Sequence, residues 1–199
     1  MKPKKYAISI MVFVLLSFFC GCASFRAGNL PPVSQWPPQP TMKGKSVSIV
    51  VSGEAILNGK EQEVSANFIE IWREPTVKAY HESGLFSEVK TGLTETDLRA
   101  EVKIVDRGKV NLGSAFLTGL TLYLIPSNGT DELVVKTTIK DGEGKTLGTF
   151  EKSETITLYQ QLFLIFAMPF NFPGSVVKKT LYDLNRATII EAHSKGCFL

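Results

Sequence analysis

Histidine and cysteine are scarce in this sequence of 199 residues, which holds two histidines and three cysteines. His193 and Cys197 would supply only two of the four ligands that a closed zinc site takes, and His81 lies far from both along the chain. A Gly-x-Ser-x-Gly elbow, a Walker loop and a dinucleotide-binding glycine pattern are all missing. Since no nucleophile, base and orienting group can be nominated together, we expect no enzyme activity, no metal and no cofactor.

Excess positive charge is also missing from most of the chain. The formal net charge is +3, and Lys2, Lys4 and Lys5 supply all of it; beyond residue 21 there are 22 − 3 = 19 Lys+Arg against 19 Asp+Glu. A neutral chain lacks the electrostatic footprint of a nucleic-acid-binding protein, so no nucleic-acid partner is expected. The 44% hydrophobic and 21% charged residues are typical of a globular protein and exclude global disorder.

The N-terminus has the pattern of a bacterial export signal. Three lysines precede an uncharged run over residues 6–19, which is shorter than the roughly 20 residues of a permanent transmembrane helix. The residues that follow, Phe19-Cys20-Gly21-Cys22-Ala23, resemble the lipobox of bacterial lipoproteins, in which a small residue precedes the Cys that receives a diacylglyceryl group. Gly21 before Cys22 fits this pattern, whereas Phe19, where the family usually has Leu, and Cys20 depart from it.

The resemblance implies that residues 1–21 are a lipoprotein signal peptide and that Cys22 becomes an N-terminus with three acyl chains, enough for stable attachment to a membrane. Cys20 is the alternative acceptor, although bulky Phe19 precedes it. Ordinary secretion and an uncleaved anchor are the alternatives to acylation. In this family Asp after the modified Cys resembles a signal for retention at the inner membrane, and Ala23 is not Asp. The expected location is the periplasmic face of the outer membrane.

A proline-rich linker is predicted over residues 22–45. It contains half of the ten prolines of the chain: Pro31, Pro32, Pro37, Pro38 and Pro40. Because proline fixes φ and removes a backbone donor, we expect a semi-rigid, partly polyproline-II spacer that rises about 3.1 Å per residue. Such a spacer could hold a domain up to roughly 70 Å from the membrane. Trp36 within it would either dock on the domain or contact a partner.

Residues 46–199 are predicted to form one periplasmic α+β domain, in which helices pack on a small, mostly antiparallel sheet. Alternation of apolar and polar residues, together with the turn at residues 141–144, predicts strands over 46–52, 98–104, 133–140 and 146–157. Apolar residues at helical spacing predict helices over 64–83 and 175–193. Pro75 is expected to kink or split the first helix, and Gly84 to cap it.

Residues 80–89, Tyr-His-Glu-Ser-Gly-Leu-Phe-Ser-Glu-Val, resemble a segment that recurs in small periplasmic α/β domains of envelope lipoproteins and in the N-terminal domain of the Tol system. In those domains a helix ends at Ser-Gly-Leu-Phe and the next strand joins a small sheet. The resemblance covers ten residues, and it supports the fold class without implying an activity.

Two long segments, residues 110–130 and 155–177, contain no charged residue. Each is long enough to span a membrane, but both contain several polar residues, and the strongly apolar part of the second is confined to residues 162–170. Three interpretations stay open: buried core elements, an exposed patch that contacts lipid or a partner protein, and a membrane-inserting hairpin. The patch would consist of Phe116, Leu117, Phe163, Phe166, Met168 and Phe170. Serine at 163 and 166 should then weaken association and leave the fold intact.

These observations favour an outer-membrane lipoprotein whose domain is a non-enzymatic binding or assembly module, with another envelope protein as its partner. The alternative is a carrier of lipid or another apolar ligand, with segments 110–130 and 155–177 lining a pocket. Cys197 is the one thiol left once Cys20 is removed and Cys22 is acylated, so it is available to pair with a second chain.

Overall fold

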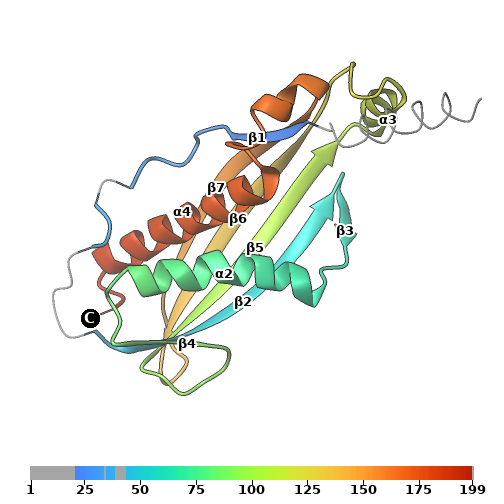
Figure 1. Ribbon diagram of the computed structural model, residues 1–199. Helices are drawn as coiled ribbons and strands as arrows, with labels where there is room; N and C mark the ends of the chain where they lie inside the picture. The colour runs from blue at the N-terminus through green and yellow to red at the C-terminus, as the bar shows by residue number, and fades with distance from the viewer. Residues whose placement is uncertain (1–20, 34, 39–43, 199) are drawn as a thin grey trace, which may run out of the picture.

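The computed structural model describes residues 21–33, 35–38 and 44–198 (Figure 1). These residues form one seven-stranded sheet in the order β1-β7-β6-β5-β2-β3, and β4 pairs with β2 beside β3. All pairs are antiparallel except those of β2 with β4 and β5. The strands are β1 (Cys22–Arg26), β2 (Ser46–Leu57), β3 (Lys60–Gln62), β4 (Glu88–Thr91), β5 (Leu98–Val110), β6 (Ser127–Asp141) and β7 (Thr146–Gln160). The predicted α+β class with a mostly antiparallel sheet is confirmed.

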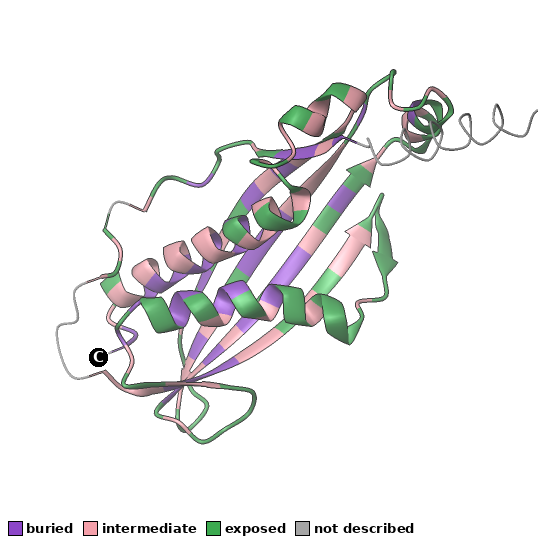
Figure 2. Ribbon diagram, viewed as in Figure 1, coloured by how far each residue is buried: buried purple, intermediate pink, exposed green. Residues whose placement is uncertain are grey.

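Two long helices, α2 (Ala66–Glu82) and α4 (Pro173–Ser194), cover one face of the sheet and lie side by side (Figure 1). Alternate residues of the central strands face these helices, because successive side chains of a strand point to opposite sides. The buried sides of both layers meet in one core, purple in Figure 2. Its largest fully buried apolar side chains are Trp72, Tyr80, Leu98, Ile104, Leu133, Ile139, Ile156, Leu181, Leu184, Ile189 and Val47.

Among the described residues, no helix packs on the opposite face of the sheet (Figure 1). This face carries polar and charged side chains. Salt bridges join neighbouring strands there, with Lys103 to Glu54 at 2.5 Å and Arg107 to Glu132 at 3.2 Å. Exposed pairs of this kind add little stability, about 0.2–1 kcal/mol each. The core therefore lies on the helix side, and the open face is available to solvent or a partner.

Helix α2 begins at the N-cap Ser65, whose side chain accepts a hydrogen bond from the amide of Phe68. Gly84 follows the helix with a φ of +65°, a conformation that glycine adopts at little cost, so the predicted cap is confirmed. The helix runs through Pro75 without being split, contrary to one form of the prediction. Pro75 and Thr76 are buried, so packing against the core compensates for the backbone hydrogen bond that proline removes.

The N-terminal segment, within the predicted proline-rich spacer, packs on the domain. Residues 22–26 form strand β1 against β7, and Leu30 belongs to the core. Trp36 packs edge-on against Tyr182 of α4 with ring centroids 6.5 Å apart, and the Arg186 guanidinium lies 4.9 Å from its ring centre. Sheet pairing and side-chain packing thus outweigh the preference of the prolines for an isolated extended chain. The predicted signal peptide lies outside the described residues, except for Gly21.

Candidate functional site

The two uncharged segments meet at one end of the sheet. Helix α3 (Leu112–Leu120) follows β5, and the short 3-10 helix η1 (Leu162–Phe166) follows β7, and both lie at the same end of the molecule (Figure 1). The amide of Leu162 donates a hydrogen bond of 2.9 Å to the carbonyl oxygen of Tyr123, which joins the two segments directly. We call residues 112–125 and 162–172 the apolar end.

Helix α3 exposes its apolar side chains instead of burying them. Leu112, Phe116, Leu117 and Leu120 are all at least half exposed, while Thr118 is the helix's buried residue. A surface helix of a globular protein normally turns its apolar stripe toward the core. The reversed orientation of α3 therefore leaves an apolar surface without a partner in the described part of the chain.

The segment around η1 is also exposed. Phe163, Phe166 and Phe170 are 66%, 80% and 85% exposed, whereas Met168 is half-buried. Burial in the core is therefore excluded for these three phenylalanines, and for Phe116 and Leu117 of α3. Of the six residues expected in an apolar patch, five are exposed at the apolar end. No helix within residues 21–33, 35–38 and 44–198 is long and apolar enough to cross a membrane.

Further exposed apolar residues at this end were not singled out from the sequence. They lie in the loop after α3 and before α4: Leu122, Leu124, Ile125 and Phe172. Loop residues follow no helical or strand period, so periodicity could not mark them. The sequence signal that could have pointed to these residues was the absence of charge from the two segments.

Cys22, the predicted acylation site, lies beside the apolar end. It is the first residue of β1 and pairs with Gln160, the last residue of β7. The carbonyl oxygen of Gly21 accepts a hydrogen bond of 3.0 Å from the amide of Gln161. A Cβ atom on Gly21 would lie 2.5 Å from the backbone nitrogen of Ile165, so the chain enters the fold in close contact with η1.

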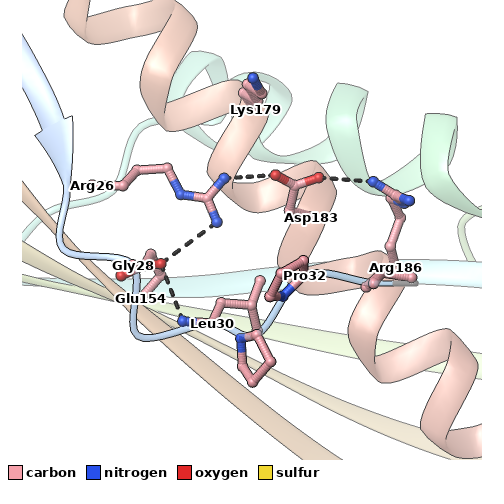
Figure 3. Close-up of a pocket in the computed structure, with 10 residues that line it drawn as sticks. Arg26, Gly28, Leu30, Pro32, Glu154, Lys179, Asp183 and Arg186 are labelled. Carbon is pink, nitrogen blue, oxygen red and sulfur yellow. Dashed lines mark hydrogen bonds and ion pairs between the residues drawn. The ribbon is translucent and has the colours of Figure 1, made fainter.

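The buried carboxylate of Glu154 holds the segment that follows β1 by hydrogen bonds to its backbone amides (Figure 3). We call Glu154 with the amides of Asn29 and Leu30 the clamp. Glu154 of β7 is fully buried and accepts hydrogen bonds from the amides of Asn29, Leu30 and Thr155 at 3.1, 3.2 and 2.9 Å. Burial alone would raise its pKa, but these three amides and the nearby charge of Arg26 outweigh it and hold the pKa of Glu154 below its usual range. The carboxylate is therefore ionised and structural.

The clamp borders a pocket of about 360 Å³ between the N-terminal segment and α4 (Figure 3). Arg26 lies 3.5 Å from Glu154 and 2.6 Å from Asp183, and Arg186 lies 3.1 Å from Asp183. These charges pair with one another, so Lys179 is the lining cation that forms no salt bridge to another described residue. The arrangement of the pocket fits attachment of the N-terminal segment to α4 better than ligand binding.

The geometry does not support the carrier alternative. Phe116, Phe163 and Phe166 are exposed and line none of the four best-defined pockets over the described residues. One of these pockets, of about 490 Å³, is lined by Val110, Asn111 and residues 128–130 of the first uncharged segment, but by no residue of the second. An apolar ligand carried by these side chains would be left exposed to water on one side, whereas carrier sites enclose most of the ligand surface.

Two carboxylates on the helix side of the sheet are partly buried. Asp131 of β6 lies opposite Gly108 of β5. Asp106 is two residues before Gly108 on the same strand, so the side chains of Asp106 and Asp131 face the same side of the sheet. Burial, together with the negative charge of Asp131, raises the pKa of Asp106 to about 6. Burial also raises the pKa of Asp131. Neither acid has a salt-bridge partner among the described residues. Burial and mutual repulsion of the two carboxylates therefore destabilise the fold at neutral pH.

Cys197 and His193 lie at the end of α4, where they serve the core. Cys197 is buried, and burial raises the pKa of its thiol. The ring of His193 stacks on Phe198 with centroids 6.4 Å apart. Pairing of Cys197 with a second chain would require this end of the helix to open. Across the described ranges, no three His, Cys, Asp or Glu side chains gather where they could hold a metal ion.

Comparison with known proteins finds distant structural similarity but no family. No family model and no curated protein sequence matches the chain. The PelC dodecamer from Paraburkholderia phytofirmans is 10% identical over 83% of this chain and 95% of that chain, with a TM-score of 0.39. A neuraminyllactose-binding hemagglutinin homologue from Helicobacter pylori is 8% identical over 84% and 88%, with a TM-score of 0.40. Similarity at this level is too distant to indicate a function.

Proposed function

We propose that this chain is a lipid-anchored, non-enzymatic binding or assembly module on the periplasmic face of the bacterial outer membrane. The observation that carries the proposal is the position of Cys22, which begins strand β1 of the central sheet beside the apolar end. An acylated Cys22 would join the folded domain to lipid through a rigid strand, with no flexible spacer between them.

The open face of the sheet is the surface that we assign to a protein partner. Strands β5, β6 and β7 lie side by side on this face, and its exposed side chains include Lys136 and Arg107. A transient partner can bind a polar, charged surface of this kind. Interfaces of transient complexes are on the whole no more apolar than the rest of a protein's surface. This face stays accessible when the apolar end is directed at a membrane.

Metabolic labelling with a fatty-acid probe tests the anchor. The wild-type chain should be labelled and should remain with the membrane after cell breakage, and Cys22→Ala should lose both properties. Cys197→Ala is the matched control and should keep its label, because Cys197 is buried at the far end of α4. A wild-type chain without label, or label that persists in Cys22→Ala, would refute the assignment.

Photo-crosslinking in intact cells tests the binding module. A crosslinker at Lys136, on the open face, should capture one envelope protein in constant proportion to this chain. The same group at Glu61, an exposed position on the edge strand β3, is the control and should capture it less. Capture of lipid or of many unrelated proteins with equal yield at both positions contradicts the proposal.

A further inference from the structure

We infer that the apolar end lies in the interfacial layer of the same lipid bilayer that holds Cys22, so that the domain sits directly on the membrane surface. This inference rests on the proposed anchoring at Cys22. The occupant of the apolar end is then lipid, and the strands point away from the membrane, with the hairpin between β6 and β7 at the distal end (Figure 1).

The first argument is where the chain leaves the fold. Residues 6–19 are uncharged and apolar, and they connect to the described structure at Gly21, in contact with η1. An anchor at this point, whether acyl chains or an uncleaved segment, brings lipid to the apolar end. Cys22 pairs with Gln160 at the end of β7, and Gly21 accepts a hydrogen bond from the amide of Gln161, just before η1.

The chemistry of acylation fits the backbone at this position. A diacylglyceryl thioether on Cys22 carries two acyl chains, so a third chain has to be attached to the amino nitrogen as an amide. The carbonyl of that amide occupies the place of the Gly21 carbonyl, which accepts the hydrogen bond of the Gln161 amide. The processed chain can therefore keep this bond, and its amide-linked acyl chain starts against η1.

The second argument is the extent and composition of the exposed surface. Eleven of the exposed large hydrophobic residues belong to the apolar end: Leu112, Phe116, Leu117, Leu120, Leu122, Leu124, Ile125, Phe163, Phe166, Phe170 and Phe172. No charged residue interrupts segments 110–130 and 155–177. Contiguous exposed apolar surface marks a contact with protein or membrane. The nine residues of α3 are too few to cross a bilayer but suit a helix that lies in its interface.

The third argument is the charge at the border of the apolar end. The charged residues that flank the two uncharged segments are Lys109, Asp131, Glu154 and Lys178. The two acids are less accessible, because Glu154 is fully buried and Asp131 is partly buried. Lys178 is 45% exposed but pairs with Glu74 at 2.5 Å, whereas Lys109 is exposed and forms no salt bridge to another described residue. An exposed cation such as Lys109 at the edge of an apolar surface suits the phosphates of lipid headgroups.

Depth-dependent fluorescence quenching tests the inference. Single tryptophans are introduced as Phe116→Trp and Phe166→Trp in the full, acylated chain, with Leu93→Trp as the matched control. Leu93 is 76% exposed and lies in the loop before β5, at the end of the sheet opposite to η1. Each protein is reconstituted in vesicles of phosphatidylethanolamine and phosphatidylglycerol whose acyl chains carry bromine, a quencher of tryptophan emission. Emission of the parent protein, from Trp36 and Trp72, is subtracted.

The added emission at 116 and 166 should fall about twofold in brominated vesicles, because both side chains contact acyl chains. The emission at 93 should not change. Addition of Phe163→Ser and Phe166→Ser to Phe116→Trp should reduce its quenching, while Leu93→Ser should not. Circular dichroism checks that the fold persists, which we expect because all these side chains are exposed.

The outcomes separate this inference from the proposed function. An acylated, vesicle-bound protein without quenching at 116 and 166 overturns the inference and leaves the anchor standing. Quenching in a chain that mass spectrometry shows to begin at Met1 supports the inference and contradicts acylation. Tryptophans at 116 and 166 that shift to the blue without bromine quenching, in a protein that sediments as an oligomer, identify a second copy of this chain as the occupant and overturn the inference.

Discussion

The backbone amide of Leu30 donates a hydrogen bond of 3.2 Å to the carboxylate of Glu154, across 124 positions of the chain. Asn29 donates to the other oxygen of the same carboxylate. A charged group without exposure to water is costly unless hydrogen bonds and opposite charge satisfy it. Here the N-terminal segment supplies those bonds, so its attachment and the stability of β7 depend on each other.

Glu154→Gln should lower the free energy of unfolding by about 3 kcal/mol. The amide of glutamine has one acceptor oxygen and a donor group, so it cannot accept the amide hydrogens of Asn29, Leu30 and Thr155 as the carboxylate does. Urea unfolding followed by circular dichroism measures the change. Glu151→Gln, at an exposed position on the same strand, is the control and should change stability little. Equal effects of the two substitutions would contradict the clamp.

The same carboxylate predicts an acid-labile fold. Its pKa is below that of an ordinary glutamate, so its contribution to stability is present above about pH 4.3, the pKa of Glu in unfolded chains. This contribution is lost as the pH falls through the lower pKa of the folded state. Unfolding curves between pH 5 and about 2 should therefore lose stability more steeply for the wild-type chain than for Glu154→Gln. Parallel curves would contradict the pKa shift.

Trp36→Ala should loosen the N-terminal segment from α4 without unfolding the sheet. The substitution removes the ring that packs on Tyr182 and lies under the guanidinium of Arg186. Hydrogen exchange should become faster in residues 27–38 and stay unchanged in β5 and β6. Gln35→Ala, at an exposed neighbouring position, is the control. Unchanged exchange in Trp36→Ala would show that the docking of Trp36 adds nothing to the clamp at Glu154.

Asp106→Asn should stabilise the protein at pH 7 by about 1 kcal/mol, a value reduced for the partial exposure of this side chain. The pKa of Asp106 rises from 3.8 to about 6 on folding, so the folded state holds the proton more tightly than the unfolded state. The wild-type chain should therefore gain stability as the pH falls from 7 toward 4, and lose it as the pH rises through 6. Asp106→Asn should flatten this dependence.

Denaturation at a series of pH values measures both effects of Asp106. Glu95→Gln, at an exposed loop position, is the control and should leave the pH dependence as it is in the wild-type chain. The window of Asp106 lies above that of Glu154, so the two contributions can be separated. A wild-type stability that rises between pH 5 and 7 would contradict this assignment.

Gly53→Ala should destabilise the fold by about 3 kcal/mol, because a methyl group has no space there. Its Cβ would lie 2.0 Å from Cζ3 of Trp72 and 2.8 Å from the backbone oxygen of Ile104. Gly119→Ala in α3 is the matched control, since no atom lies within 4 Å of the added carbon. That change should be neutral or stabilising by about 0.5–1 kcal/mol, because alanine favours helix. Thermal unfolding of the two variants makes the comparison.

The elements that the sequence predicts well are those with a local cause. Alternation marks β5, because its inward residues Leu98, Ala100, Val102 and Ile104 are buried. The hairpin between β6 and β7 follows from Gly144, whose φ is +87°. Gly84, predicted as the cap, marks the C-terminal end of α2. In each case the signal lies within a few residues of the element that it specifies.

The elements that the sequence does not predict depend on partners far along the chain. Strand β1 is short and pairs with β7 across 130 to 138 positions of the chain, so no local pattern identifies it. The apolar residues of α3 and η1 have the composition of core elements, and only tertiary structure shows that they face outward. The burial of Glu154 could have been predicted from the sequence, because Glu154 lies on the same side of strand β7 as the buried residues Phe150 and Ile156.

For a chain anchored at Cys22 as we propose, the packing of residues 27–33 and 35–38 along α4 would fix the height of the domain above the bilayer. Residues 27–33 and 35–38 run from β1, beside the apolar end, toward the other end of the fold, where β2 starts (Figure 1). Extra residues inserted before β2 would lengthen the connection between β1 and β2, but they would not move the domain away from the membrane. For a chain moored at Cys22, a partner therefore has to come down to the membrane surface, since the domain cannot extend outward to find it.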